Sequence, residues 1–149
     1  MLLCRLIAIP LAPMAPSAMI FTRPPTTAAK QDDCYIPGSV LRAGLRPSPL
    51  TREMGETLDV VFDDSSVFAV APEDTSAIVT TWDDAKPLRS GWAWGQERLK
   101  GNAAIVDFPV GLGRAVLSGR DLNFRGQSYA SFRILLAAFF RSAESDQSR

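Results

Sequence analysis

Two tryptophans, Trp92 and Trp94, are the side chains of this sequence best suited to hold a ligand. They lie two positions apart between Gly91 and Gly95, and residues with this spacing share one face of an extended segment. Rings placed in this way stack on a ligand or contact the surface of a partner protein. They can also cover the edge of a hydrophobic core, which is the commoner role, and the sequence leaves both roles open.

A group of polar residues lies between a predicted hairpin and the last predicted helix. Arg120, Arg125 and Gln127, together with Asn123, carry the donors needed to bind an anion or a carboxylate. The N-terminal N–H groups of the helix that follows would add to such a site. Hydrogen bonds within the loop and to solvent are the simpler role. These residues and the two tryptophans are the candidate binding residues.

The residues needed for hydrolytic or metal chemistry are missing from the sequence. It contains no histidine, so no serine or cysteine has an imidazole base to activate it. Ser90 and Ser118 each precede a glycine, but neither lies in a G-x-S-x-G motif. Cys4 and Cys34 form no C-x-x-C motif, which excludes a zinc knuckle; they are either one disulfide or two unrelated thiols. We expect no catalytic residue, metal site or cofactor in this chain.

Acidic doublets and a glycine pair resemble functional motifs only superficially. Adjacent residues on a strand point to opposite faces, so a doublet is not an acid–base pair. We expect solvated turn acids at 32–33, 63–64 and 83–84. Gly111 and Gly113 lack the rest of a dinucleotide fingerprint, and they predict a tight hairpin connection instead.

The composition is that of one globular domain. The chain has 149 residues, of which 46% are hydrophobic. This is enough to form a hydrophobic core that does not depend on disulfides or metal ions. Sixteen basic and sixteen acidic residues give a net charge of zero, so nothing indicates a nucleic-acid partner. A neutral chain is prone to association, which favours a protein partner or a second copy.

The first 33 residues differ from the rest, and we expect an irregular leader or a signal segment there. Residues 6–21 are apolar but are interrupted by Pro10, Pro13 and Pro16, which argues against a membrane-spanning helix. An early arginine and the small residues at 15–18 are typical of a secretory signal.

The strands and the helix that would position the candidate binding residues are predicted within a domain at 34–142. A disordered tail is predicted at 143–149. β-Branched and aromatic runs separated by turn residues predict strands. These runs lie at 40–45, 58–62, 67–70, 77–82, 103–110 and 114–117. Ser128 predicts the start of a helix that extends to about Ser142. Its apolar residues recur at helical spacing and predict the buried face: Phe132, Leu135, Leu136, Phe139 and Phe140.

Several of these segments look familiar as a set. They are residues 90–104 (SGWAWGQERLKGNAA), 110–119 (VGLGRAVLSG) and 123–128 (NFRGQS), preceded by 35–39 (YIPGS) and 61–65 (VFDDS). Together they resemble the C-terminal region of bacterial zinc carboxypeptidase-like proteins of the carboxypeptidase A type. In that family a class I glutamine amidotransferase-like domain follows the peptidase domain. The resemblance runs from about Tyr35 to Phe140.

The resemblance implies a fold class and a role. The fold would be α/β, an incomplete class I glutamine amidotransferase-like (flavodoxin-like) domain that is strand-rich and has a C-terminal packing helix. The family's zinc ligands, a His-x-x-Glu pair and a further histidine, are missing, so zinc would belong only to the family's peptidase domain.

The role would be that of a non-catalytic accessory domain, with a peptidase domain of a parent protein or a second copy as its partner. The alternative is a module that binds a peptide or a small molecule. Relatives of this kind are often exported, which favours a periplasmic or secreted location.

Overall fold

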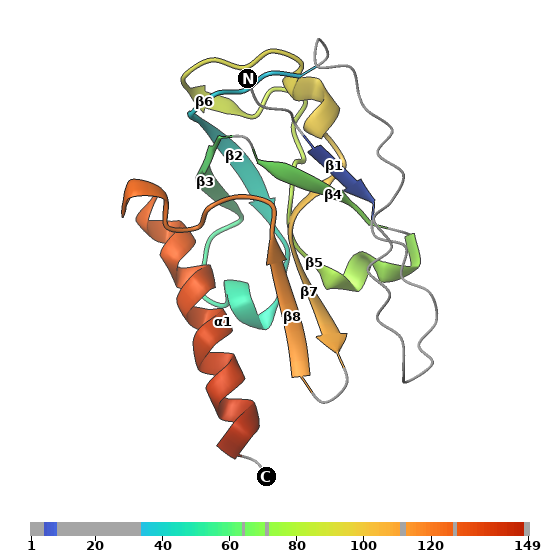
Figure 1. Ribbon diagram of the computed structural model, residues 1–149, viewed down its shortest axis with the longest axis vertical. Helices are drawn as coiled ribbons and strands as arrows, with labels where there is room; N and C mark the ends of the chain where they lie inside the picture. Colours follow the sequence, from blue (N-terminus) through green and yellow to red (C-terminus); the bar gives the residue numbers. More distant parts are fainter. Residues whose placement is uncertain are drawn as a thin grey trace.

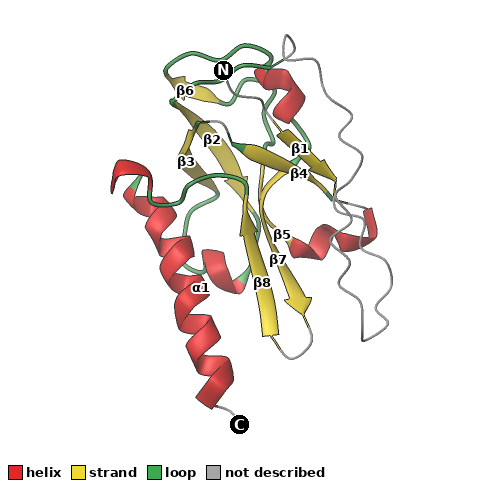
Figure 2. Ribbon diagram, viewed as in Figure 1, coloured by secondary structure: helices red, strands yellow, loops and turns green. Residues whose placement is uncertain are grey.

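A computed structural model gives the fold and describes residues 5–8, 34–63, 65–70, 72–110, 113–126 and 128–147 (Figure 1). Within these residues eight strands form one sheet, and a single long helix lies along it (Figure 2). The strands are β1 (Arg5–Ala8), β2 (Ser39–Leu45), β3 (Thr57–Phe62), β4 (Ser66–Ala69), β5 (Ile78–Thr81), β6 (Leu88–Ser90), β7 (Ala103–Val110) and β8 (Gly113–Ser118). The helices are α1 (Tyr129–Gln147) and the short 3-10 turns η1 (Pro49–Thr51), η2 (Pro72–Ala77), η3 (Gln96–Leu99) and η4 (Phe124–Gly126).

The sheet is largely antiparallel. Its order is β1-β4-β7-β5-β2-β3, with β6 added to β2 and β8 added to β7. Among the described pairings β1 with β4 is parallel, whereas the others are antiparallel. A strand-rich α/β fold with one C-terminal helix is therefore confirmed. The flavodoxin-like class, which has an open and mostly parallel sheet, is not confirmed by these pairings.

The strands predicted from the sequence are all present, with ends that differ by a few residues. The hairpin of β7 and β8 has Val110 opposite Gly113, and Gly111 lies outside the described residues. β7 pairs with β4, β5 and β8, and its residues from Ala103 to Phe108 are all buried, which explains the apolar run from Ala103 to Val106. Of the acidic doublets, Asp63, Asp83 and Asp84 are exposed, while 32–33 and 64 lie outside the described residues.

The sequence did not indicate a strand in the predicted leader, whereas a disulfide was one of the two states that it left open for the cysteines. Arg5–Ala8, in the predicted leader, is a strand of the sheet and pairs with β4 in parallel. Cys34 is disulfide-bonded, and the other cysteine, Cys4, lies outside the described residues. No helix in the part of the chain that the structure describes is long and apolar enough to span a membrane.

The hydrophobic core lies between the sheet and α1. Trp82 is completely buried and packs edge-on against Phe62, with ring centroids 5.7 Å apart. Leu41, Ile105 and Ile134 are also fully buried and belong to the same apolar cluster. Side chains of this size each contribute roughly 1.5–3 kcal/mol to the stability of the fold when buried, so this cluster stabilises the packing of the helix against the sheet.

The helix α1 contacts the core with a different face from the one predicted. Ile134 is fully buried and Ser131 is 3% exposed, but Leu136, Phe139 and Phe140 are 51%, 65% and 68% exposed. The predicted buried face is therefore wrong for these three residues. The small side chain of Ser131 lets the helix backbone approach the sheet closely, and its hydroxyl donates to the carbonyl of Leu122.

The helix α1 begins directly after Ser128, as predicted, whereas its C-terminal end differs from the prediction. The Ser128 hydroxyl donates to the backbone carbonyl of Asp59, while its own carbonyl accepts the Ser131 N–H at 2.8 Å. The helix continues to Gln147, through most of the segment that we expected to be a disordered tail. Residues 143–147 contain neither glycine nor proline, so nothing local ends the helix there.

A buried carboxylate joins three elements near the C-terminal half of α1. The side chain of Asp107, on β7, is only 6% exposed. It accepts a hydrogen bond from Arg114 of β8 at 2.8 Å and is 3.3 Å from a nitrogen of Arg141 on α1. Two cations on one buried carboxylate compensate its loss of water and hold the helix against the hairpin.

Candidate functional site

The positions of Trp92 and Trp94 are set by the backbone of the segment after β6. Gly91 has a φ of +99°, and a Cβ atom there would lie 2.5 Å from the hydroxyl oxygen of Ser39. Because glycine leaves this space open, the buried Ser39 hydroxyl donates to the Trp92 carbonyl at 2.6 Å and accepts the Trp92 N–H at 2.9 Å. Trp94 then exchanges two backbone hydrogen bonds of 2.9 Å with Tyr35. The tryptophans are therefore held by main-chain contacts.

Three aromatic side chains form an exposed surface, which we call the aromatic surface: Tyr35, Trp92 and Trp94. They are 41%, 52% and 59% exposed, respectively, while Ala93 between the tryptophans packs against the core. The rings of Tyr35 and Trp92 meet edge to face, with centroids 5.5 Å apart and planes at 62°. The prediction that Trp92 and Trp94 share a face agrees with their exposure. Tyr35 was missed, because its contact with them is across strands rather than along the chain.

The structure places Arg120 and Arg125 in different environments. Arg120 is only 6% exposed and its guanidinium lies over the ring of Trp82, 5.3 Å from the centroid. Arg125 is exposed, has a φ of +46° and lies over the ring of Phe124. Gln127 lies outside the described residues. The expectation of a solvated loop is therefore wrong at Arg120, because the core supplies an aromatic face that accepts its planar cation.

Arg120 has an unusual electrostatic environment for a core residue. One of its nitrogens, Nη2, is 3.3 Å from the hydroxyl of Thr80, but Nε and Nη1 have no hydrogen-bond partner among the described residues. The indole Nε1 of Trp82 is likewise buried without a partner in this part of the structure. Burial lowers the pKa of Arg120 to about 9. The guanidinium is thus a buried cation without a carboxylate partner in the described structure.

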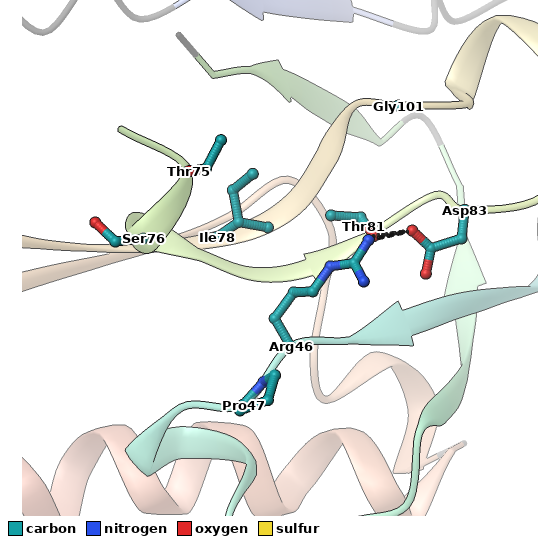
Figure 3. Close-up of a pocket in the computed structure, with 8 residues that line it drawn as sticks. All are labelled: Arg46, Pro47, Thr75, Ser76, Ile78, Thr81, Asp83 and Gly101. Atoms are coloured by element: carbon teal, nitrogen blue, oxygen red, sulfur yellow. Dashed lines mark hydrogen bonds and ion pairs between the residues drawn. The ribbon is translucent and has the colours of Figure 1, made fainter. Parts of the chain in front are cut away.

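A cavity of about 410 Å³ lies where β2 ends beside β5 (Figure 3). Arg46 extends from the end of β2 toward Asp83, with 2.6 Å between its Nη2 and the carboxylate, and it is 3.1 Å from the Thr81 hydroxyl. This ion pair neutralises both charges, so the cavity offers a polar but nearly neutral wall. Sequence inspection did not find Arg46, since only the pairing of Gly44 with Thr81 brings it near Asp83. The lining residues are Arg46, Pro47, Thr75, Ser76, Ile78, Thr81, Asp83 and Gly101.

A second ionic group lies where α1 begins. Arg42 of β2 binds Asp59 of β3 through two nitrogens, at 2.8 and 3.0 Å, and Arg89 of β6 lies 4.0 Å from the same carboxylate. The hydrogen bond from Arg42 lowers the pKa of Asp59 below its ordinary value. These side chains are about half exposed, so the pair mainly fixes the register of β2 and β3 and adds little to stability.

Comparison with known proteins adds no relative. No family model, no curated protein and no solved structure matches this chain. Among the described residues no group of three histidine, cysteine, aspartate or glutamate side chains could hold a metal ion. The functional interpretation therefore depends on the aromatic surface and on the resemblance of the sequence segments.

Proposed function

We propose that this protein is a non-catalytic accessory domain of a zinc metallocarboxypeptidase-like protein, and that the aromatic surface contacts its peptidase partner. One observation carries the proposal. Residues 90–104, which resemble the family, contain Trp92 and Trp94, whose side chains are more than half exposed while their backbone is hydrogen-bonded to Ser39 and Tyr35. The finer fold assignment, an incomplete class I glutamine amidotransferase-like domain, belongs to the same proposal.

The physical chemistry of the aromatic surface favours a binding role. Tryptophan and tyrosine are the residues most enriched where protein interfaces concentrate their binding energy. A side chain that is more than half exposed gives little stability to the fold, whereas it gives large apolar area to a partner. Because hydrogen bonds already hold the backbone at Trp92 and Trp94, little backbone entropy is lost in this segment when a partner binds.

A second candidate function is the binding of a peptide or a small molecule on the same surface. The observation that favours it is the edge-to-face contact between Tyr35 and Trp92, which leaves part of each ring open to a flat or apolar ligand. The loop from Arg120 to Gln127 is no longer part of this candidate as one unit, since Arg120 is buried.

The proposal predicts that Trp92→Ala and Trp94→Ala each weaken binding to a zinc metallocarboxypeptidase domain encoded upstream in the same gene region. We expect a loss of about 1.5–3 kcal/mol, roughly a 10- to 150-fold rise in Kd, from each substitution. Isothermal titration calorimetry measures this loss. Lys86→Ala is the control, because Lys86 is exposed and belongs neither to the aromatic surface nor to α1.

Two results would count against this function. One is an upstream DNA sequence without an in-frame or frameshifted peptidase. The other is an unchanged Kd in both tryptophan variants. If short peptides instead quench the tryptophan fluorescence in the wild type but not in Trp92→Ala, the second candidate replaces the first.

A further inference from the structure

The outward side of α1 carries a row of large apolar side chains, which we call the outer stripe: Tyr129, Phe132, Leu136, Phe139 and Phe140. Four of them are well exposed, at 83% for Tyr129, 51% for Leu136, 65% for Phe139 and 68% for Phe140. Their spacing of three and four residues places them on one side of the helix. Figure 1 shows α1 at one edge of the molecule, alongside the sheet.

The exposed area of the outer stripe is large for a single chain. Aromatic side chains bury 150–250 Å² when covered, so the exposed parts of these residues amount to roughly 400–600 Å². A monomeric protein exposes at most about 300–600 Å² of continuous apolar surface, and such a patch is often functional. Two copies of the stripe together bury roughly 1,000 Å², which approaches the size of a specific interface.

We infer that the outer stripe is the contact between two copies of this chain, with their α1 helices packed antiparallel. In a two-fold symmetric dimer, the patch on one copy contacts the same patch on the other copy. When the two-fold axis is perpendicular to the helices, the two helices run in opposite directions. In this arrangement the two helix dipoles also oppose each other favourably. The stripe is apolar along its length, so it is complementary to itself.

The charged positions beside the outer stripe fit an antiparallel pair. Arg133 is exposed, and position 144, a glutamate, lies eleven residues further on, which is three turns and nearly the same side of the helix. An antiparallel pair centred between these positions places position 133 of each helix beside position 144 of the other. The centre then falls among Leu136, Phe139 and Phe140.

The net charge of the chain supports association between copies. With sixteen basic and sixteen acidic residues, two copies have no long-range repulsion to overcome. A contact of about 1,000 Å² lies at the small end of specific interfaces, where weak association is typical. This contact is independent of the aromatic surface, so a dimer is compatible with either function proposed above.

The test is sedimentation equilibrium of the full chain across low to high micromolar concentration. We expect a monomer–dimer equilibrium for the wild type, and a monomer at all these concentrations for Leu136→Glu and for Phe140→Glu. Both residues are exposed, so the far-ultraviolet circular dichroism of these variants should not change. A wild type that sediments as a monomer throughout this range overturns the inference, and another occupant then covers the stripe.

A charge-exchange series tests the direction of the helices. Arg133→Glu and Glu144→Arg should each weaken the dimer about 5-fold or more, and the double variant should restore it. Lys100→Glu is the matched control, since it makes the same change of charge at an exposed position outside α1. Dimerisation that survives Leu136→Glu, or a double variant weaker than both single ones, contradicts the antiparallel contact.

Discussion

Replacing Arg120 with methionine is expected to raise the free energy of unfolding by about 1–4 kcal/mol, although it removes a contact. The guanidinium is buried, and two of its three nitrogens have no hydrogen-bond partner among the described residues. Its compensation is the ring of Trp82 and one long hydrogen bond to Thr80. A cation–π contact and one such bond offset only part of the desolvation of a charge.

Methionine suits the space that Arg120 leaves. Its unbranched side chain has a similar length, and its sulfur makes favourable contacts with an aromatic ring such as that of Trp82. Urea unfolding, followed by tryptophan fluorescence, measures the change in free energy. Arg120→Lys is the control: it keeps the charge without the flat guanidinium, so its stability should not exceed that of the wild type.

The gain in Arg120→Met should depend on pH. Burial lowers the pKa of Arg120 from 12.5 to about 9 in the folded protein. Between these values the unfolded chain binds more protons than the folded one, so the stability of the wild type rises with pH. The penalty is largest below pH 9 and is relieved above it. The difference between variant and wild type should therefore shrink from about pH 8 to about pH 10.

A loss of stability in Arg120→Met would contradict this account. It would show that an anion compensates the guanidinium in solution, close to the indole N–H of Trp82, which also has no partner in the described structure. Added phosphate or acetate should then raise the melting temperature of the wild type and leave that of the variant unchanged.

The burial of Arg120 could not be predicted from the sequence, and the reason is physical. Arginine is among the residues least often buried, and its neighbours along the chain are polar. Its place in the core follows from contacts with Thr80 and Trp82, which lie about forty residues earlier and are brought close by the sheet. The spacing of apolar residues describes one helix or strand at a time. It does not show which residues from distant parts of the chain the sheet brings into contact.

The elements themselves were more predictable than their arrangement. The run at 103–110 is apolar and β-branched, and the structure places it in the centre of the sheet, buried over most of its length. Strand direction is not encoded in such a run. The family resemblance implied a parallel sheet, whereas the described strands pair mostly antiparallel.

The face that α1 buries shows the same limit. Apolar residues occupy a wide arc of this helix, so more than one of its faces has apolar residues at helical spacing. Packing selected the side with Ser131 and Ile134, since small side chains allow the helix to approach the sheet. By contrast, a shared face for Trp92 and Trp94 followed directly from their spacing, because it depends only on an extended backbone. Their exposure did not follow from it, since the spacing equally allows both rings to cover the edge of the core.

Gly119→Ala is expected to destabilise the protein by roughly 3–5 kcal/mol, the sum of overpacking and lost hydrogen bonds. Gly119 follows β8 and lies between β4 and β7. A Cβ atom there would be 1.9 Å from the backbone oxygen of Ser66, far closer than side-chain carbons approach other atoms. The oxygen belongs to the backbone, so it cannot move aside as the end of a flexible side chain would.

The same glycine holds two strands through its own backbone. Its N–H donates to the carbonyl of Ala104 at 3.0 Å, and its carbonyl accepts the N–H of Ser66 at 2.6 Å. A methyl group that pushes Ser66 away lengthens the second bond and separates β4 from β7. The melting temperature, followed by circular dichroism, should fall by about 10 °C.

Gly113→Ala is the matched control on β8, since a Cβ atom there meets only the Val110 oxygen at 3.7 Å. It should leave the melting temperature unchanged or slightly higher, because alanine restricts the unfolded chain. Equal melting temperatures for the two variants would show that β4 does not lie against Gly119 in solution.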